Sequence, residues 1–379
     1  MGKKGALPMT GSAADGAAPA EAPNDAALAP VREKIDAIDR ELIELLNLRA
    51  RLAAEVGRLK SRHGLPVYRP EREVGVLRAA TALNPGPLSA ATLEAIFREI
   101  ISACRALEQP LSVAFLGPAG TFSELAALRQ FGNGVRMDAC ASIDDVFQAA
   151  ESARSDYAVV PVENSTEGAV SRTLDLLLST GLKIISEVSV PVQHHLLTLS
   201  GTLEAIAQVF AHPQALAQCH NWLNQNVPAL KRVQVASNAE AARQASLDPT
   251  GAAVAGENAA LLYGLTPVAR QIQDDPQNRT RFLVLGPQQC APTGQDKTSL
   301  VLSVHNRAGA VHHMLGPLAQ HGVSMTRFES RPARTGSWEY YFYVDVEGHE
   351  TDPAVAAALE ELRQTCAFFR CLGSYPRAA

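Results

Sequence analysis

The 379-residue sequence predicts a multidomain chain that combines an all-helical segment with two α/β regions. Three observations support this fold class. Apolar residues recur at three- and four-residue steps from Leu28 to about Arg62, which indicates a long amphipathic helix. From Leu111 onward, short apolar runs alternate with helical patterns, as in βα units. After Asp296 the order becomes strand, helix, strand, strand, helix and strand.

Composition narrows the class of protein. The length suggests two or three domains, and 46% hydrophobic residues allow large cores. A net charge of −5 gives no general attraction to nucleic acid or to an anionic membrane, and no apolar run approaches the roughly 18 residues that span a bilayer. Residues 1–27 have no continuous apolar core of a signal peptide, so we expect a disordered tail. Six scattered cysteines without a CxxC pair favour free thiols in a reducing cytoplasm.

The first helix would be roughly 50 Å long at 1.5 Å per residue, so its apolar stripe needs a partner. A second copy of the chain is the simplest one, and a plain coiled-coil dimerisation module is the alternative. Arg49 and Lys60 are eleven residues apart and point the same way. Arg32 points roughly 100° away from Arg49 and could serve the pocket of a partner chain.

Two shorter helices are expected after the break at residues 63–66. One covers 71–83, and the other begins after the cap Ser89 and runs to about Glu108. Glu108 lies on the same stripe as Phe97, Ile101 and Cys104. A carboxyl group on a buried stripe must be paired or protonated, unless Glu108 lies at a frayed helix end.

The second region begins with a predicted strand over 111–116, a glycine turn over 117–120 and a helix capped by Ser123. This arrangement can bind an anion at the helix N-terminus, or it can be a plain βα turn. It matches no nucleotide-binding loop. The alternation then continues through mostly parallel sheets in two lobes around a cleft, similar to periplasmic type II binding proteins, with Ser142 and Ser237 as helix caps.

Polar residues after the predicted strands should converge on that cleft. His194, His195 and His212 match no zinc spacing, so buried hydrogen-bonded histidines are expected and no metal site is predicted. Asn278 to Arg281 precede the apolar run that starts at Phe282 and place the Thr280 hydroxyl between two guanidiniums. Guanidiniums suit carboxylates, although a surface turn before a strand would look the same.

The third region reads as βαββαβ, which is a ferredoxin-like order. It has no acid–base constellation, so we expect it to bind a ligand rather than to catalyse a reaction. A dimerisation sheet without a ligand is the alternative.

Several separate motifs, taken in order, carry a resemblance to known families. Gly117–Ser123, Val160–Ser165, Asn278–Phe282 and Glu329–Pro332 resemble prephenate dehydratase with an ACT regulatory tail, and the segment before residue 109 resembles a chorismate mutase. The chain is therefore similar to the bifunctional chorismate mutase–prephenate dehydratases. The resemblance implies a tail over 1–27, a mutase domain over 28–108, a dehydratase domain over 111–290 and an ACT domain over 297–376.

For the mutase, the resemblance implies an intertwined helical dimer with Arg32 entering the other subunit's site. Lys60 and Glu108 are the expected catalytic donors to the ether oxygen of chorismate, and no nucleophile is needed. Arg69, Cys104 and Glu108 stand where the familiar enteric form has aspartate, serine and glutamine. The substrate-binding residues implied are Arg32, Arg49, Lys60, Arg69, Arg72, Glu73, Cys104 and Glu108.

For the dehydratase, the resemblance implies that Thr280 assists the departure of the hydroxyl group of prephenate. The implied substrate-binding residues are Thr121, Phe122, Ser123, Glu163, Asn164, Ser165, Ser237, Arg281 and Phe282. No metal or organic cofactor is expected. In the ACT domain, two motifs would bind phenylalanine at a dimer interface, and they comprise Gly309, Ala310, Val311, Glu329, Ser330, Arg331 and Pro332.

The expected protein is a cytoplasmic enzyme that makes phenylpyruvate from chorismate for phenylalanine biosynthesis and is inhibited by phenylalanine. We expect a homodimer or a larger even homo-oligomer, without a nucleic-acid or membrane partner. The rival hypotheses are a solute-binding protein without turnover and an amino-acid-sensing regulator. The absence of a signal peptide opposes the first, and the absence of a basic recognition helix opposes the second.

Overall fold

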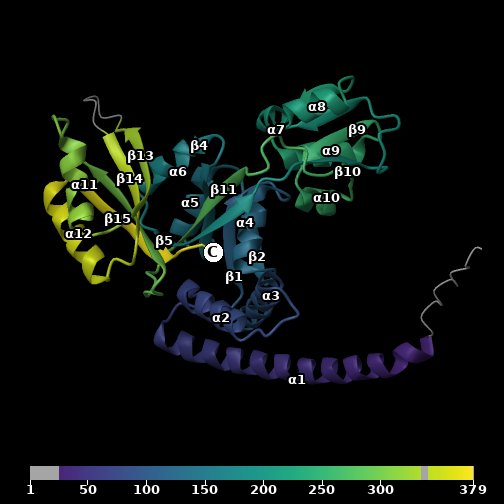
Figure 1. The fold of residues 1–379 in the computed structure, drawn as a ribbon, viewed down its shortest axis with the longest axis horizontal. Helices are drawn as coiled ribbons and strands as arrows, with labels where there is room; N and C mark the ends of the chain where they lie inside the picture. The colour runs from purple at the N-terminus through teal and green to yellow at the C-terminus, as the bar shows by residue number, and fades with distance from the viewer. Residues whose placement is uncertain (1–24, 334–339, 379) are drawn as a thin grey trace, which may run out of the picture. The chain divides into compact units, whose positions relative to one another are not determined.

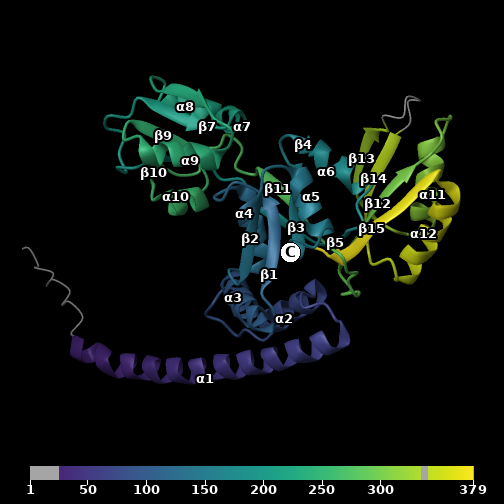
Figure 2. The same cartoon turned by 180° about the vertical axis from the view of Figure 1, so that it is seen from behind.

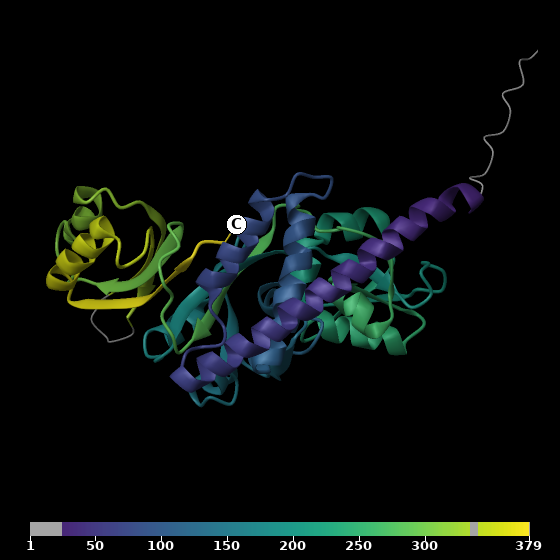
Figure 3. The same ribbon diagram turned by 90° about the horizontal axis from the view of Figure 1, so that it is seen from below.

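The computed structural model describes residues 25–333 and 340–378. The chain divides into two units at Arg51 and Leu52, and each is described by itself. Helix α1 (Asp25–His63) is one continuous helix (Figure 3) and begins slightly before the predicted start at Leu28. The rest of the predicted tail lies outside the described residues.

The apolar stripe of α1 is exposed to solvent. Ile38 and Leu45 each expose 63% of their surface, although residues of this type are usually buried. Fully burying one such side chain stabilises a protein by about 1.5–3 kcal/mol. The stripe in the first unit is therefore a large apolar surface exposed to solvent. It consists of Leu28, Val31, Ile35, Ile38, Leu42, Ile43, Leu45 and Leu48.

Two helices follow α1 close to their predicted ranges, α2 (Pro70–Ala82) and α3 (Ala90–Glu108). The predicted cap is confirmed, because the Ser89 side chain accepts a hydrogen bond from the Thr92 N–H. The C-terminal part of α1 lies against the end of α3. A Cβ on Gly57 would come within 2.8 Å of the Glu108 Cα, so only glycine permits this approach.

The first lobe of the second region is a mixed sheet with the strand order β2-β1-β3-β11-β5, and β4 pairs with β3. Strands β1, β2 and β3 are parallel, whereas β11 is antiparallel to both of its neighbours. The strands are β1 (Leu111–Leu116), β2 (Val135–Cys140), β3 (Tyr157–Asn164), β4 (Gly168–Ala169), β5 (Lys183–Pro191) and β11 (Arg279–Gly286). The helices are α4 (Phe122–Phe131), α5 (Ile143–Glu151) and α6 (Ser171–Leu177).

Alternate residues of β11 belong to two different cores, because successive side chains of a strand point to opposite faces. Phe282 and Val284 pack in the cluster that contains Ala126 and Phe131 of α4. Leu283 and Leu285 pack in the other cluster, with the residues of α5 and α6. Both faces of the sheet are therefore covered, and β11 is a central buried strand.

The second lobe is a five-stranded sheet with the order β10-β6-β9-β7-β8, surrounded by short helices (Figure 2). Its strands are β6 (His195–Thr198), β7 (Gln208–Ala211), β8 (Lys231–Gln234), β9 (Gly251–Ala255) and β10 (Thr266–Ala269). Its helices are α7 (Pro213–Gln218), α8 (His220–Asn226), α9 (Asn238–Leu247) and α10 (Glu257–Tyr263).

The two-lobed α/β architecture agrees with the sequence prediction, but the expectation of mostly parallel sheets is wrong. The chain crosses between the lobes from β5 to β6 and returns from β10 to β11, so the strands at these crossings run against their neighbours. The helix predicted near 214–226 is two helices that meet at Cys219. The predicted Ser123 cap is also wrong, because Thr121 accepts the hydrogen bond from the Glu124 N–H.

The third domain is the predicted βαββαβ sheet, with the strand order β13-β14-β12-β15. Helices α11 and α12 cover one face (Figure 1), where Leu300, Met314 and Leu362 form a core. Val301 and Tyr343 on the other face join the core of the first lobe. The elements are β12 (Asp296–Ser303), α11 (Ala310–Gln320), β13 (Met325–Pro332), β14 (Tyr340–Glu347), α12 (Pro353–Thr365) and β15 (Phe368–Pro376).

No helix in the two described ranges is both long enough and apolar enough to cross a membrane. All six cysteines are free thiols, and each is buried or half-buried.

Candidate active sites

The end of β3 and the start of β11 bring together five residues singled out in the sequence. Thr280 lies opposite Asn164, and Arg281 lies opposite Glu163. The Ser165 hydroxyl accepts a hydrogen bond from the Arg279 N–H at 2.9 Å, which ties the loop after β3 to the entry of β11. Two segments more than a hundred residues apart thus form one polar site.

The Asn164 side chain has its amide orientation fixed by its neighbours. Its Oδ1 accepts hydrogen bonds from the backbone N–H groups of Thr166 and Glu167. The Nδ2 must therefore be the group that donates to the Thr280 Oγ1 at 2.9 Å. Since the Thr280 oxygen accepts this bond, its own proton is available for a substrate atom. In the described part of the chain, this proton has no protein acceptor.

Asn278 lies directly behind this pair and was not among the predicted site residues. It is 1% exposed, and its Oδ1 accepts the second hydrogen bond from Asn164 at 2.9 Å. Its Nδ2 is buried without a hydrogen-bond partner among the described residues. The signal in the sequence was its place at the entry of the strand that carries Thr280, but the sequence could not show that its side chain turns inward.

The Arg281 guanidinium lies in a buried ionic cluster rather than at an open surface. Its Nε donates to Glu187 at 2.7 Å, its Nη1 donates to Asp345 at 2.7 Å and its Nη2 donates to the Tyr375 hydroxyl at 3.1 Å. Lys297 completes the cluster by donating to Glu187 at 2.7 Å. Asp345, Tyr375 and Lys297 belong to the third domain, so Arg281 joins that domain to the first lobe.

The other predicted dehydratase residues form no hydrogen bond with Thr280. Thr121 and Ser237 use their hydroxyls to cap α4 and α9. Phe122 stacks edge-on with His194 of the second lobe at 5.7 Å, Ser123 is buried in the first turn of α4, and Phe282 is buried in the core beneath the strand.

The turn before α4 already holds an internal anion. The Glu124 carboxylate accepts a hydrogen bond from the Gly120 N–H, while the Glu124 N–H donates to Thr121. This is a reciprocal capping arrangement. The N–H groups of Gly120 and Glu124 are thus already bonded within the chain. This favours a plain βα turn over an anion-binding site at the start of α4.

The expectation of buried, hydrogen-bonded histidines is confirmed for His194 and His195. His194 Nε2 lies 3.0 Å from Gln218 Oε1, and burial lowers the pKa of His194 to about 4. His195 Nδ1 accepts a hydrogen bond from the Gln271 N–H at 3.1 Å. His194 is therefore neutral at ordinary pH.

Among the predicted mutase residues, Lys60 and Glu108 form a direct pair. The Lys60 Nζ lies 2.8 Å from the Glu108 Oε2 and also donates to the Val67 carbonyl at 2.8 Å. Because an ammonium group has three donors, one remains for a substrate. Gly57 sets the spacing, since any larger residue would push Glu108 away from Lys60. Glu108 is thus held by packing rather than frayed at the helix end.

Glu73 is half-buried and forms a salt bridge with Arg105, which also donates to the Phe131 carbonyl of α4. Burial raises the pKa of Glu73, while Arg105, Arg98 and Lys60 act in the opposite direction. Arg105 also lies over the rings of Tyr68 and Phe131 at 5.1 and 5.6 Å from their centroids. Arg105 was not predicted as a site residue, because its partners lie on three other segments.

The other predicted mutase residues of the second unit form no hydrogen bond with Lys60 or Glu108. Arg69 pairs with Glu71 at 2.7 Å, and Arg69 and Arg72 line a separate cavity of about 300 Å³. Cys104 is buried in α3. Arg32 is exposed and Arg49 half-buried on the α1 segment that belongs to the first unit.

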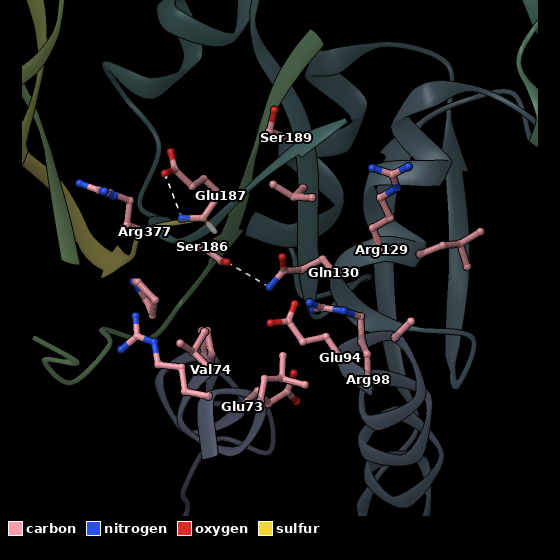
Figure 4. Close-up of a pocket in the computed structure, with 18 of the residues that line it drawn as sticks. Glu73, Val74, Glu94, Arg98, Arg129, Gln130, Ser186, Glu187, Ser189 and Arg377 are labelled. Carbon is pink, nitrogen blue, oxygen red and sulfur yellow. Dashed lines mark hydrogen bonds between the residues drawn. The ribbon is translucent and has the colours of Figure 1, made fainter. Parts of the chain in front are cut away.

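A cavity of about 750 Å³ lies between α2, α3, α4 and β5 (Figure 4). Glu73 and Arg98 come from the two helices, Arg129 comes from α4 and Ser189 comes from β5. Guanidiniums and carboxylates line it in similar measure, so its charge favours no single class of ligand. Thr280 does not line this cavity. Burial and the nearby Arg279 guanidinium lower the pKa of Arg129, which does line it.

The predicted effector residues fall in two places in the third domain. Gly309, Ala310 and Val311 line a cavity of about 270 Å³ at the start of α11, together with Tyr340 and Phe342 of β14. Gly309 has φ of +76°, a conformation that favours glycine. The second motif lies on β13, where Ser330 pairs with Phe342 and Pro332 pairs with Tyr340. The two motifs are therefore connected through β14.

Comparison with known proteins agrees with this organisation. Family models match at residues 31–109 (chorismate mutase type II), 113–290 (prephenate dehydratase) and 298–364 (ACT domain). A bifunctional chorismate mutase/prephenate dehydratase of Neisseria gonorrhoeae is 50% identical over 357 residues, which cover 93% of this chain and 98% of the relative. The corresponding protein of Escherichia coli K12 is 35% identical over 373 residues, covering 92% of this chain and 96% of the relative.

Two solved structures resemble about 70% of the chain. The prephenate dehydratase of Arthrobacter aurescens, solved in complex with L-Phe, has a TM-score of 0.65 and 34% identity, and covers 71% of this chain and 90% of its own. A protein described as a novel type of quorum quenching acylase has a TM-score of 0.65 and 33% identity, with 70% of this chain and 98% of its own covered.

Together, the three domains define a two-reaction enzyme with a sensing domain. The chain belongs to the bifunctional chorismate mutase/prephenate dehydratases. It carries both the isomerase and the lyase of phenylalanine biosynthesis.

Proposed function

We propose that Thr280 is the general acid of the dehydratase, and the observation that supports this role is its hydrogen bond from Asn164. In prephenate, the bond from the ring to the carboxylate breaks and its electron pair forms the aromatic ring. The bond to the ring hydroxyl breaks at the same time, and the departing oxygen needs a proton. Because Asn164 donates to the Thr280 oxygen, the Thr280 O–H can donate its proton to the leaving group, which departs as water, and the Thr280 oxygen is then reprotonated from solvent.

The buried Asn278 side chain supports this arrangement, because its Oδ1 also accepts a hydrogen bond from the Asn164 Nδ2 and so fixes the position of that amide. Glu163 and Ser165 shape the same loop, and Arg281 holds the strand in place. We assign the substrate carboxylates to cations outside the buried cluster, because the Arg281 guanidinium is already occupied by Glu187 and Asp345.

In the mutase, Lys60 and Glu108 are proposed to stabilise the negative charge that develops on the ether oxygen of chorismate. A carboxylate only accepts hydrogen bonds, whereas a protonated acid donates one. Glu108 can therefore donate to the ether oxygen only as the protonated acid, in which one oxygen can still accept the Lys60 hydrogen bond at 2.8 Å while the other donates. Lys60, held by Val67 and by Glu108, would supply the second donor.

The dimer proposed here is formed by α1 of two copies. The exposed stripe on this helix is the apolar surface that a second copy would bury, and Arg32 would then contribute to the mutase site of the partner. Phenylalanine is proposed to bind at the start of α11 and on β13. The choice of phenylalanine as the effector is supported by the Arthrobacter aurescens relative, which was solved in complex with L-Phe. The enzyme is proposed to act in the cytoplasm, in keeping with its free thiols.

The dimer is tested with Leu45→Glu, which places a charge on the apolar stripe. We expect analytical ultracentrifugation to shift toward the monomer, and mutase activity to fall more than dehydratase activity because Arg32 no longer reaches a partner. Asn47→Glu is the control, since it adds the same charge about 200° around the helix. A dimer of unchanged stability in Leu45→Glu would contradict the proposal.

Thr280→Ala should lower the dehydratase kcat by on the order of 10²-fold or more, because the proton donor is removed. Mutase activity should stay unchanged, since that site lies on other elements. Both rates can be followed in one sample that is given chorismate, with phenylpyruvate as the final product. Thr280→Ser keeps the hydroxyl and should retain most of the activity. Equal loss of both reactions in Thr280→Ala would indicate misfolding, and retained dehydration would remove Thr280 from its role.

Glu108→Gln tests the protonation of the mutase site. Wild-type mutase kcat/KM should fall as pH rises, because deprotonation converts the Glu108 donor into an acceptor. The amide of the variant donates at every pH, so its activity should persist on the alkaline side. The measurement is mutase kcat/KM against pH for both proteins. Superimposable profiles would mean that Glu108 does not donate to the ether oxygen.

Gly309→Ala tests the effector site at α11. A non-glycine residue in the left-handed region costs about 1–2 kcal/mol, so strain that disturbs the first turn of α11 should weaken phenylalanine binding by about 5–30-fold. Gly294→Ala is the matched control, because Gly294 has φ of +79° in the linker before β12. Calorimetry that gives both variants wild-type affinity would place the effector elsewhere.

A further inference from the structure

Strand β13 has two faces with different partners. Its side chains alternate between half-buried and exposed. On the half-buried face, the Arg327 Nε lies 2.9 Å from the Glu163 Oε2 and the Arg331 Nη2 lies 2.7 Å from the Asp175 Oδ1, both in the first lobe. The opposite, exposed face presents Phe328, Ser330 and Pro332. Strand β13 therefore carries a proposed effector motif and also forms salt bridges with the dehydratase domain.

The Arg327 contact reaches Glu163, a residue of the dehydratase site itself. Glu163 precedes Asn164, whose amide donates to the Thr280 hydroxyl at 2.9 Å. Glu163 is also paired along the backbone with Arg281, the neighbour of Thr280. A displacement of the Glu163 carboxylate would therefore disturb β3 and β11, the two strands that position the Thr280 hydroxyl.

The Glu163 carboxylate lies between two guanidiniums. Its Oε2 is 2.9 Å from the Arg327 Nε and 3.8 Å from the Arg281 Nη1. The Arg281 side is anchored by Glu187 and Asp345, each at 2.7 Å, so Arg281 is the fixed partner. If β13 shifts, Glu163 can leave Arg327 and close on Arg281, which gives two discrete arrangements of the same groups.

The Arg327 side of this pair is the weaker one. The Glu163 side chain is 38% exposed, whereas Glu187 and Asp345 in the neighbouring cluster are 4% and 6% exposed. The Nη2 of Arg327 is buried and has no hydrogen-bond partner among the described residues. The contact between Arg327 and Glu163 is therefore easier to break than the cluster around Arg281.

We propose that Arg327 is the positioning residue that links effector binding on the third domain to the dehydratase, by holding or releasing Glu163. This inference rests on the proposed phenylalanine regulation. It requires that phenylalanine bind the two arrangements with different affinity, since a ligand shifts an equilibrium only by that difference. Typical coupling between two sites corresponds to a 5–150-fold change in affinity.

The test uses the full-length enzyme with Arg327→Gln, which removes the guanidinium and its charge but keeps a polar side chain. Because Glu163 is released in this variant without the effector, dehydratase kcat/KM without phenylalanine should move toward the value that wild type shows with saturating phenylalanine, and calorimetry should still detect phenylalanine binding. The ratio of dehydratase activity without and with saturating phenylalanine should fall by at least about fivefold. Arg327→Lys retains the charge and should restore part of this ratio, which a purely structural role would not explain.

Arg363→Gln is the matched control, because Arg363 forms an exposed pair with Glu360 in the same domain. It should leave both binding and inhibition unchanged. Inhibition of Arg327→Gln equal to that of wild type would overturn the proposal. Loss of phenylalanine binding in Arg327→Gln would overturn it too, because Arg327 would then belong to the effector site. Failure of the underlying regulation is separately visible as wild-type enzyme that phenylalanine does not inhibit.

Discussion

A buried guanidinium holds the sensing domain against the dehydratase. Arg281 donates to Glu187 of the first lobe and to Asp345 of the third domain, each at 2.7 Å. Removal of one partner from such a pair leaves an uncompensated charge, which typically destabilises a protein by about 3–5 kcal/mol. Arg281 is also the next residue after Thr280. The same interaction that joins the domains therefore fixes the strand that carries the proposed proton donor.

The apolar packing follows the same geometry. Leu283 and Leu285 of β11 share one core with Val301 and Tyr343 of the third domain. The sensing sheet therefore packs against the catalytic sheet, and the two are not joined by a linker alone. Because close-packed cores do not deform continuously, a shift of the sensing sheet should move between discrete arrangements. A conformational change in the sensing domain can therefore reach the dehydratase through direct contacts, without a long series of intervening residues.

Local patterns predicted most elements but not their long-range contacts. Periodicity predicted the βαββαβ order and the strand that starts near Arg281, because both depend on neighbouring residues. The bond between Arg281 and Asp345 joins residues 64 positions apart, and no local pattern encodes it. The cap at Thr121 was missed because Ser123 fitted the same rule, and the choice between them depends on where the turn ends. The βα alternation predicted that Thr280 and Asn164 converge on one cleft, but it could not predict that the two residues pair directly, since strand register is a tertiary property.

The mutase helices are tied to the dehydratase by a second shared cation. Arg105 pairs with Glu73 and also donates to the Phe131 carbonyl, while Tyr68 is fully buried beside Phe131. Glu73 is an expected chorismate-binding residue, so its carboxylate position depends on a helix of the neighbouring domain. A free-standing mutase of the same helices would have to hold this carboxylate by other means. In this chain the fusion therefore helps to position the Glu73 carboxylate, in addition to placing two activities on one polypeptide.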